Sequence, residues 1–271
     1  MAGRFVAVGD SFTEGVGDSN VLYPNGVRGW ADRMARQLGR HDPAWEYANL
    51  AIRSKVLDEV VTEQLDRALE LDPTVVSFYA GGNDILALRV DMDSVLQRYE
   101  AALTRLVGSG ARVLVFTTFD LKMSAMLEPL KRRIRFYNNG VRHLAALHGA
   151  QLVDHTQWRE YDDPRLWSLD RIHMSRLGHK RLAGYVCDSI GVPHTLKIPE
   201  LPDWEPRHWR QVVKEERVFL RDEVVPLVRR RMSGVREGDT LQPKWPDPVH
   251  PADGLKKLAR QRAAEADRVP P

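Results

Sequence analysis

The chain has 271 residues, of which 43% are hydrophobic and 28% are charged, and its formal net charge is +3. This composition excludes a mainly disordered chain, and the length allows a large core without disulfide or metal support. We expect no transmembrane helix, because no run of about 18 apolar residues occurs, and no signal peptide, because the first apolar stretch is short. The single cysteine, Cys187, excludes an internal disulfide and agrees with a reducing compartment, so we expect a cytoplasmic protein.

Charge and proline content change near residue 200. Residues 201–271 hold 15 Lys and Arg and 12 Asp and Glu, so the whole net charge of +3 lies in this last quarter. The same region is rich in proline and shows no strand-like apolar run. We therefore predict one domain over residues 1–200 and a helical, irregular and basic extension over residues 201–271.

Short apolar runs alternate with stretches of helical periodicity in the first 200 residues. The apolar runs predict buried strands at Arg4–Gly9, Trp45–Ala48, Thr74–Ala80, Ala111–Thr117 and Ala150–Asp154. The periodic stretches predict helices at Lys55–Leu71, Asp93–Val107, Lys131–Leu147 and Ser175–Ile190. This alternation indicates an α/β fold with a parallel sheet covered on both faces. Such sheets bind ligands at the carboxyl ends of their strands.

The extension is expected to add one helix at Trp204–Arg231, which Pro226 should kink or end. Its apolar face is a candidate surface for a homo-oligomer. The tail from about residue 236 is expected to be partly disordered or wrapped on the domain. The run Arg229–Arg231 favours a solvated helix end, and no nucleic-acid motif accompanies it, so no nucleic-acid partner is expected.

Ser11 follows the first predicted strand, within the segment Gly9-Asp10-Ser11-Phe12. A serine at the mouth of a parallel sheet can expose its hydroxyl as a nucleophile, and backbone N–H groups at a following helix can bind an oxyanion. The alternative is a turn in which Asp10 or Ser11 only caps a helix. The segment by itself does not decide between the two.

Asn83 follows the third predicted strand, within Gly81-Gly82-Asn83-Asp84. The glycines permit a tight turn, and the Asn83 amide can donate a hydrogen bond to a developing oxyanion. The alternative is an asparagine that serves only the turn. The carboxylates of Asp10 and Asp84 flank this position and are expected to brace its loops.

His173 stands just before the last predicted helix and can act as a general base near neutral pH. Asp170, three residues earlier, can accept a hydrogen bond from the other ring nitrogen. A histidine at a helix start is more often structural. However, Ser11, Asn83 and the Asp170–His173 pair share one edge of the predicted sheet. Together they supply the groups that nucleophilic acyl transfer requires.

These segments resemble the conserved blocks of the SGNH (GDSL-type) hydrolase family. The segment from Gly9 to Phe12 is similar to the first block, with Phe12 in place of the usual Leu, and Gly81–Asp84 and Asp170–His173 are similar to the third and last blocks. The resemblance covers about residues 4–190. It implies a flavodoxin-like three-layer sandwich with about five parallel strands, followed by the helical, proline-rich extension.

The resemblance also implies roles for individual residues. Ser11 would be the nucleophile, His173 the base and Asp170 the residue that orients it. The backbone N–H of Ser11 and the Asn83 amide would contribute to the oxyanion hole. Apart from the resemblance, we expect Asp10 and Gly82 to contact substrate.

The second block departs from the family pattern. Ser54 stands where the family has a glycine whose N–H completes the oxyanion hole. A serine keeps that N–H, but a position that requires a positive φ would disfavour it. Loss of one oxyanion donor costs about 100- to 1,000-fold in rate.

We therefore predict a serine-dependent carboxylic ester hydrolase for short acyl chains or small soluble esters. No metal is expected, because the spacing of His173 and His179 does not fit a helical zinc pair. The proposed reaction implies no organic cofactor. The alternative is a catalytically impaired binding protein with the extension as its interaction arm. Met123, Met126 and Leu127 are expected either to line an acyl pocket or to pack a loop over the sheet.

Overall fold

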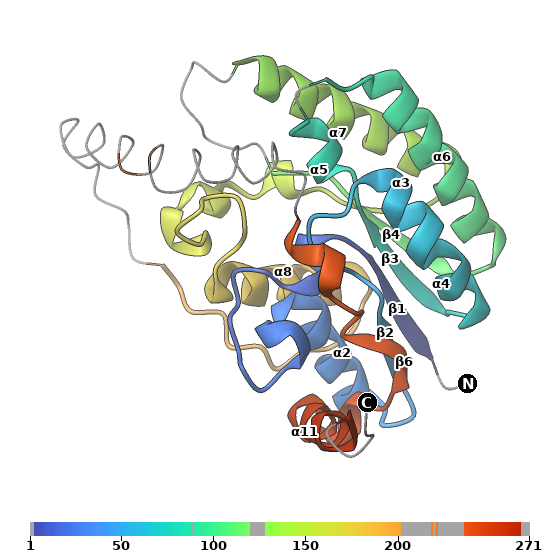
Figure 1. The fold of residues 1–271 in the computed structure, drawn as a ribbon, viewed down its shortest axis with the longest axis vertical. Coiled ribbons are helices and arrows are strands. Elements are labelled where there is room, and N and C mark those ends of the chain that lie inside the picture. Colours follow the sequence, from blue (N-terminus) through green and yellow to red (C-terminus); the bar gives the residue numbers. More distant parts are fainter. Residues whose placement is uncertain are drawn as a thin grey trace.

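The computed structural model describes residues 3–87, 89–119, 128–201, 218, 221 and 236–266. A six-stranded sheet in the order β5-β4-β3-β1-β2-β6 forms its centre (Figure 1). The strands are β1 (Arg4–Gly9), β2 (Glu46–Asn49), β3 (Val75–Tyr79), β4 (Arg112–Phe116), β5 (Gln151–Val153) and β6 (Trp245–Val249). Strands β1 to β5 pair in parallel, and β6 pairs with β2 in the antiparallel direction.

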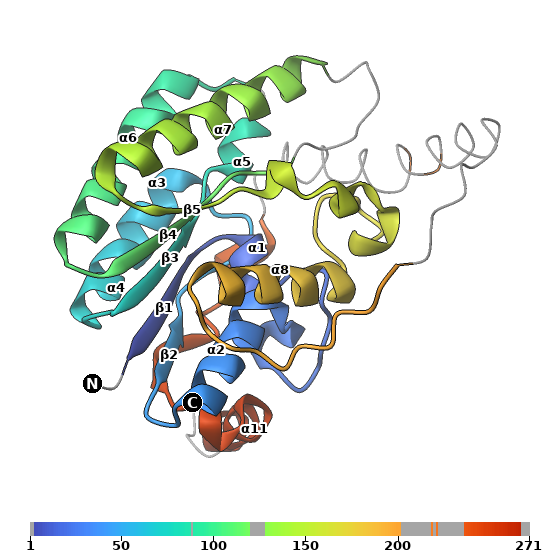
Figure 2. The ribbon, with the colours of Figure 1, turned by 180° about the vertical axis from the view of Figure 1, so that it is seen from behind.

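Helices cover both faces of the sheet, as the two opposite views show (Figures 1 and 2). One layer contains α3 (Leu57–Val60), α4 (Asp66–Glu70), α6 (Met92–Gly108) and α7 (Glu128–His148), and the other contains α2 (Gly29–His41), α8 (Arg176–Ser189) and α11 (Leu255–Ala266). Two short helices, α1 (Ser11–Glu14) and α5 (Gly82–Ile85), follow β1 and β3. A π-helical turn, Val61–Leu65, joins α3 to α4.

The core is divided by the sheet into two apolar clusters. Along β1, Val6 and Val8 pack toward α3, α6 and α7, whereas Phe5 and Ala7 pack toward α2 and α8. This alternation follows from the two-residue period of a strand whose faces are both buried. β1 is therefore an apolar run without polar alternation, which is the pattern read from the sequence.

The five predicted strands are present with ends that agree to within one residue, and the parallel α/β fold is confirmed. The predicted helices correspond to α6, α7, α8 and the α3–α4 segment. Helix α2 was not predicted. Its buried residues Trp30, Met34 and Leu38 repeat at a four-residue interval that is typical of a helix.

The expectation that no strand occurs after residue 200 is wrong. Trp245–Val249 forms β6, although this segment contains Pro246 and Pro248. β6 lies at the edge of the sheet, where a proline does not interrupt a central ladder. The predicted helix at Trp204–Arg231 lies outside the described residues except at Val218 and Arg221.

A buried ion pair joins β6 to the rest of the fold. Nζ of Lys244 lies 2.6 Å from Oδ2 of Asp32 in α2, and both side chains are fully buried. Nε1 of Trp245 donates to Oδ1 of Asp32 at 3.0 Å. Because one unpaired charge in such a place costs several kcal/mol, the segment before β6 is firmly attached to α2.

The order in which the chain adds strands to the sheet reverses next to β1. β1 lies between β2 and β3, so the strand order reverses beside it. In open parallel sheets this switch point opens the crevice that binds ligands. The residues that follow β1, β2 and β3 therefore meet at one edge. In the described part of the chain, no helix is both long and apolar enough to cross a membrane.

Candidate active site

Ser11 is the first residue of α1 and lies two residues after the end of β1. At Gly9 the backbone has a φ of +150°, and a Cβ there would overlap the carbonyl oxygen of Tyr79 on β3. A glycine thus lets the ends of β1 and β3 approach closely. Asp10 caps α1 by accepting a hydrogen bond from the Phe12 N–H at 3.2 Å.

A hydrogen-bonded chain links Ser11, His173 and Asp170. Oγ of Ser11 lies 2.9 Å from Nε2 of His173, and Nδ1 of His173 lies 2.6 Å from Oδ2 of Asp170. An ionised carboxylate can only accept, so Nδ1 carries the proton and Nε2 is free to accept from the serine hydroxyl. The structure therefore brings together three side chains from two segments that are 162 residues apart.

The turn that carries Asp170 holds its carboxylate in place. Oδ1 accepts hydrogen bonds from the N–H groups of Ile172 and His173, both at 2.9 Å, and from Oγ of Ser168 at 2.5 Å. Burial opposes ionisation of this carboxyl, but the hydrogen bonds from His173 and Ser168 outweigh it and hold the Asp170 pKa well below its ordinary value. Asp170 is therefore a fixed anion beside the imidazole.

Asn83 connects the segments that follow β1 and β2. Its Nδ2 donates to the carbonyl of Lys55 at 2.9 Å and to Oδ2 of Asp10 at 3.3 Å. The neighbouring Asp84 accepts from the N–H of Leu57 at 2.8 Å. Asp10 and Asp84 thus brace these loops, as the sequence indicates.

The Asp10 carboxyl is buried beside the serine. Burial raises its pKa from the ordinary value of 3.8 to about 7, although the hydrogen bond from the Phe12 N–H and the electrostatic influence of His173 partly offset this effect. Gly82 lies across from it, since a Cβ at Gly82 would stand 3.8 Å from Oδ2 of Asp10. Contact of Asp10 or Gly82 with substrate remains a prediction.

Ser54 adopts a backbone conformation that favours glycine. Its φ is +67°, in the left-handed region. A side chain with a Cβ costs about 1–2 kcal/mol there. The position thus has the positive φ that would disfavour a serine, and Ser54 occupies it while keeping its N–H.

A buried carboxylate that the sequence did not single out holds the residue before Ser54. Oε2 of Glu14 accepts from the backbone N–H of Arg53 at 2.7 Å, and Oε1 accepts from its guanidinium at 2.8 Å. The Glu14 side chain is fully buried, and Oε1 also accepts from Nδ2 of Asn25 at 3.0 Å. The sequence offers one indication of this role. An acidic side chain on a helix that packs against the core must pair with a donor when it is buried.

Two other histidines near the site are structural. His179 on α8 donates from Nε2 to the carbonyl of Val16 at 2.9 Å, and burial lowers its pKa to about 4. Burial lowers the pKa of His155 to about 3, and its ring stacks on Phe119. Within the described ranges, no group of three or more His, Cys, Asp and Glu residues is arranged to hold a metal ion.

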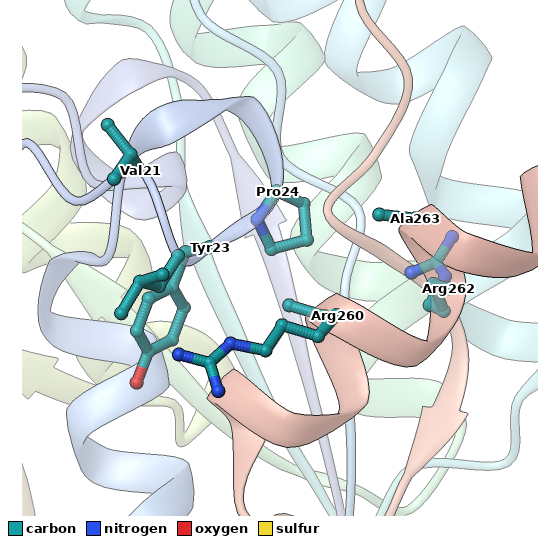
Figure 3. Close-up of a pocket in the computed structure, with 8 residues that line it drawn as sticks. Val21, Tyr23, Pro24, Arg260, Arg262 and Ala263 are labelled. Carbon is teal, nitrogen blue, oxygen red and sulfur yellow. The ribbon is translucent and has the colours of Figure 1, made fainter. Parts of the chain in front are cut away.

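A surface pocket lies apart from these residues, between the loop after α1 and helix α11. Figure 3 shows Tyr23 and Pro24 on the loop side and Arg260 and Arg262 on the helix side. Its lining includes none of Ser11, Asp170 and His173. It is therefore not the site assembled at the switch point.

Comparison with solved structures identifies the fold. The chain is similar to the acetyl xylan esterase AlAXEase, with 19% identity and a TM-score of 0.56 over 69% of this chain and 99% of that one. It is also similar to Axe2, an acetylxylan esterase from Geobacillus stearothermophilus, with 21% identity and a TM-score of 0.56 over 70% and 94%. For LAE5, an alpha/beta hydrolase enzyme from the metagenome of Lake Arreo, the identity is 20% and the TM-score 0.56 over 71% and 97%.

The family assignment comes from the sequence itself. No curated protein sequence gives a significant match. The family model of the GDSL-like lipases and acylhydrolases, in contrast, matches residues 7–181, which is well over half of the chain. This range includes Ser11, Asn83, Asp170 and His173. The chain therefore belongs to the GDSL-like lipase/acylhydrolase (SGNH) family and is a hydrolase that acts on ester bonds.

Proposed function

We propose that this protein hydrolyses carboxylic esters through Ser11, His173 and Asp170 and a covalent acyl-enzyme. The observation that carries the proposal is the unbroken chain of contacts at 2.9 Å and 2.6 Å between the three side chains. Nucleophile, base and orienting carboxylate in this order are the arrangement that serine hydrolases use on unrelated folds.

The reaction then proceeds in two halves. Oγ of Ser11 attacks the ester carbonyl while Nε2 of His173 takes its proton. The imidazolium returns that proton to the leaving alcohol, and the acyl group remains on Ser11. His173 next removes a proton from water, which attacks the acyl-enzyme, and the protonated imidazole finally returns the proton to Ser11. The anionic Asp170 stabilises the imidazolium in both halves.

The developing oxyanion requires donors at the same edge of the sheet. We assign this role to the N–H groups of Ser11 and Ser54 and to the amide of Asn83. Asn83 donates to Lys55 at 2.9 Å and to Asp10 at 3.3 Å, and the longer bond to Asp10 is the one that an oxyanion would replace. Retention of the Ser54 N–H supports catalysis over the alternative of an impaired binding protein.

The proposed substrates are esters with short acyl chains or small soluble esters. Two of the similar structures are described as acetylxylan esterases, which supports an acetyl-sized acyl group. An acetyl ester should therefore be cleaved faster than an octanoyl ester of the same alcohol.

Hydrolysis of p-nitrophenyl acetate, butyrate and octanoate by the wild type and by Ser11→Ala tests the proposal. We expect turnover that decreases with chain length and that falls at least about 1,000-fold in Ser11→Ala. Ser94→Ala, which changes a serine on α6 outside the site, serves as the control and should retain wild-type rates. Equal turnover by Ser11→Ala and the wild type would overturn the proposal.

A further inference from the structure

Two other parts of the chain lie against Arg53, whose carbonyl belongs to the peptide group that joins it to Ser54. The N–H of this peptide group belongs to Ser54, and its carbonyl oxygen belongs to Arg53. Glu14 binds the preceding N–H and the guanidinium of Arg53. On the carbonyl side stands Gly238, where a Cβ would overlap the Arg53 oxygen and would also lie 3.1 Å from Cγ2 of Ile52.

Gly238 belongs to a short segment that runs into β6, and we call residues 236–245 the C-terminal strap. Figure 1 shows the strap beside the loop that leads into α3. Arg236 binds both oxygens of the Glu59 carboxylate at 2.7 Å and 2.5 Å. Glu59 is the residue that caps the start of α3 by accepting from the Val56 N–H at 2.9 Å. The strap is therefore fixed to the helix that follows Ser54.

Two further contacts fix the other end of the strap. The carbonyl of Gln242 accepts from Nδ2 of Asn25 at 3.0 Å, and the carbonyl of Asn25 accepts from the Arg53 guanidinium at 3.1 Å. Lys244 forms the buried ion pair with Asp32. The strap is thus anchored before and after Gly238, so Gly238 cannot move away freely from Arg53.

From these contacts we infer that the C-terminal strap positions the Ser54 N–H, and that Gly238 is a positioning residue for the oxyanion hole. This inference rests on the proposed function, because it assigns a support to one of its donors. A peptide group is planar, so a force on its carbonyl oxygen turns the N–H at its other side. The left-handed φ of Ser54 is intrinsically unfavourable and persists only where its surroundings enforce it.

Gly238→Ala is the direct test. The added methyl group pushes on the Arg53 oxygen, and we expect kcat to fall about 10- to 100-fold. This decrease does not exceed the one expected when an oxyanion donor is removed altogether. KM should change less than about threefold, because the oxyanion contact forms in the transition state and not with bound ester. The pH profile should keep its shape, since Ser11, His173 and Asp170 are unchanged.

Two matched glycine variants separate positioning from general disturbance. Gly108→Ala adds a methyl group at the end of α6, where no atom lies within 4 Å apart from its chain neighbours and the backbone of its own helix. In Gly39→Ala the new Cβ on α2 would lie 2.8 Å from the backbone nitrogen of Ala252 in the extension. Arg53 is not among the nearest neighbours of this Cβ. We expect Gly108→Ala to behave like the wild type, and Gly39→Ala to lower the thermal midpoint while keeping kcat.

A second readout is affinity for a trifluoromethyl ketone, which adds to a catalytic serine and presents an anionic oxygen to the donors. For Gly238→Ala the inhibition constant should rise by the same factor as kcat/KM falls. If Gly238→Ala does not fold, Arg236→Ala replaces it, with an expected loss of about 3- to 10-fold in kcat that Arg236→Lys partly restores.

The outcomes distinguish this inference from the proposed function. An inactive wild type, or activity that survives Ser11→Ala, contradicts the proposed function. An active, serine-dependent wild type with kcat and inhibitor affinity unchanged in Gly238→Ala contradicts the role of the strap. If only Arg236→Ala can be measured, wild-type kcat in that variant has the same meaning.

Discussion

Glu14 and Arg53 are joined by three hydrogen bonds across 39 residues of sequence. Oε2 of Glu14 accepts from the backbone N–H of Arg53 at 2.7 Å and from its Nε at 3.0 Å, and Oε1 accepts from the guanidinium at 2.8 Å. Glu14 is the last residue of α1, which begins with Ser11, and Arg53 precedes Ser54. The pair therefore connects the helix of the proposed nucleophile to the loop of the proposed oxyanion donor.

Glu14→Gln tests the importance of this pair. The amide keeps one acceptor but turns a donor toward Arg53 or Asn25, so the free energy of unfolding should fall by about 2–3 kcal/mol. We expect kcat to fall about 10-fold, because the Ser54 loop loses its fixed position. Urea denaturation and p-nitrophenyl acetate kinetics measure the two effects. Glu70→Gln, which changes an exposed partner of Arg67, is the control and should alter stability by less than about 0.5 kcal/mol.

Asp170→Asn should inactivate the enzyme without unfolding it. The Asn side chain can still accept the hydrogen bonds of Ile172 and Ser168, but it no longer fixes the proton on Nδ1 of His173. We expect kcat to fall about 1,000- to 10,000-fold. Circular dichroism and the thermal midpoint provide the check on folding. A folded Asp170→Asn protein with more than a tenth of the wild-type activity would argue against the proposed role.

Ser54→Gly should relieve backbone strain and leave the chemistry intact. Glycine adopts the φ of +67° without a Cβ clash. The strain that is relieved exceeds the extra backbone entropy that glycine loses on folding, so the free energy of unfolding should rise by up to about 1 kcal/mol. The N–H is retained, so the turnover rate should stay within about threefold of the wild type. Ser54→Ala keeps the strain and should show no gain in stability. If Ser54→Gly instead turned over ester at least about 10-fold faster than the wild type, the serine would be shown to impair the oxyanion hole.

Asp10 predicts a specific pH dependence of stability. Its pKa is raised by burial to about 7, so folding favours the protonated form. The stability that Asp10 contributes is complete below its ordinary pKa of 3.8 and is lost as pH rises through about 7. Asp10→Asn does not titrate at this position. Relative to the wild type, its free energy of unfolding should therefore increase between pH 4 and pH 8, by up to about 4 kcal/mol.

Urea denaturation of both proteins at intervals across this range measures the difference. The other titratable groups are shared, so the difference reports the titration of Asp10 together with its coupling to His173. A difference that stays constant from pH 4 to pH 8 would show that burial does not raise the pKa of the Asp10 carboxyl.

Much of the fold was predictable because buried parallel strands are apolar on both faces. Strands β1 and β4, for example, appear in the sequence as the uninterrupted apolar runs Phe5–Val8 and Val113–Phe116. β6 was not predictable, because Pro246 and Pro248 are tolerated only at a sheet edge and the sequence does not show which strand lies there.

The residues of the candidate site also fall into those that the sequence could indicate and those that it could not. Ser11, Asn83, Asp170 and His173 could be singled out as candidates because each lies just after a predicted strand or just before a predicted helix, within a short motif. The contacts of Glu14 with Arg53 and of Gly238 with the Arg53 carbonyl could not, because they join segments that are far apart in sequence and carry no local pattern. Such supports depend on tertiary packing.

Covalent labelling with a fluorophosphonate tests the central claim most directly. Oγ of an activated serine attacks phosphorus and expels fluoride, so the wild type should gain one phosphonyl group, located by peptide mass spectrometry on Ser11. His173→Ala should label far more slowly, and Ser11→Ala should not label. A folded wild-type protein that remains unlabelled, or that is labelled at another residue, would contradict the account.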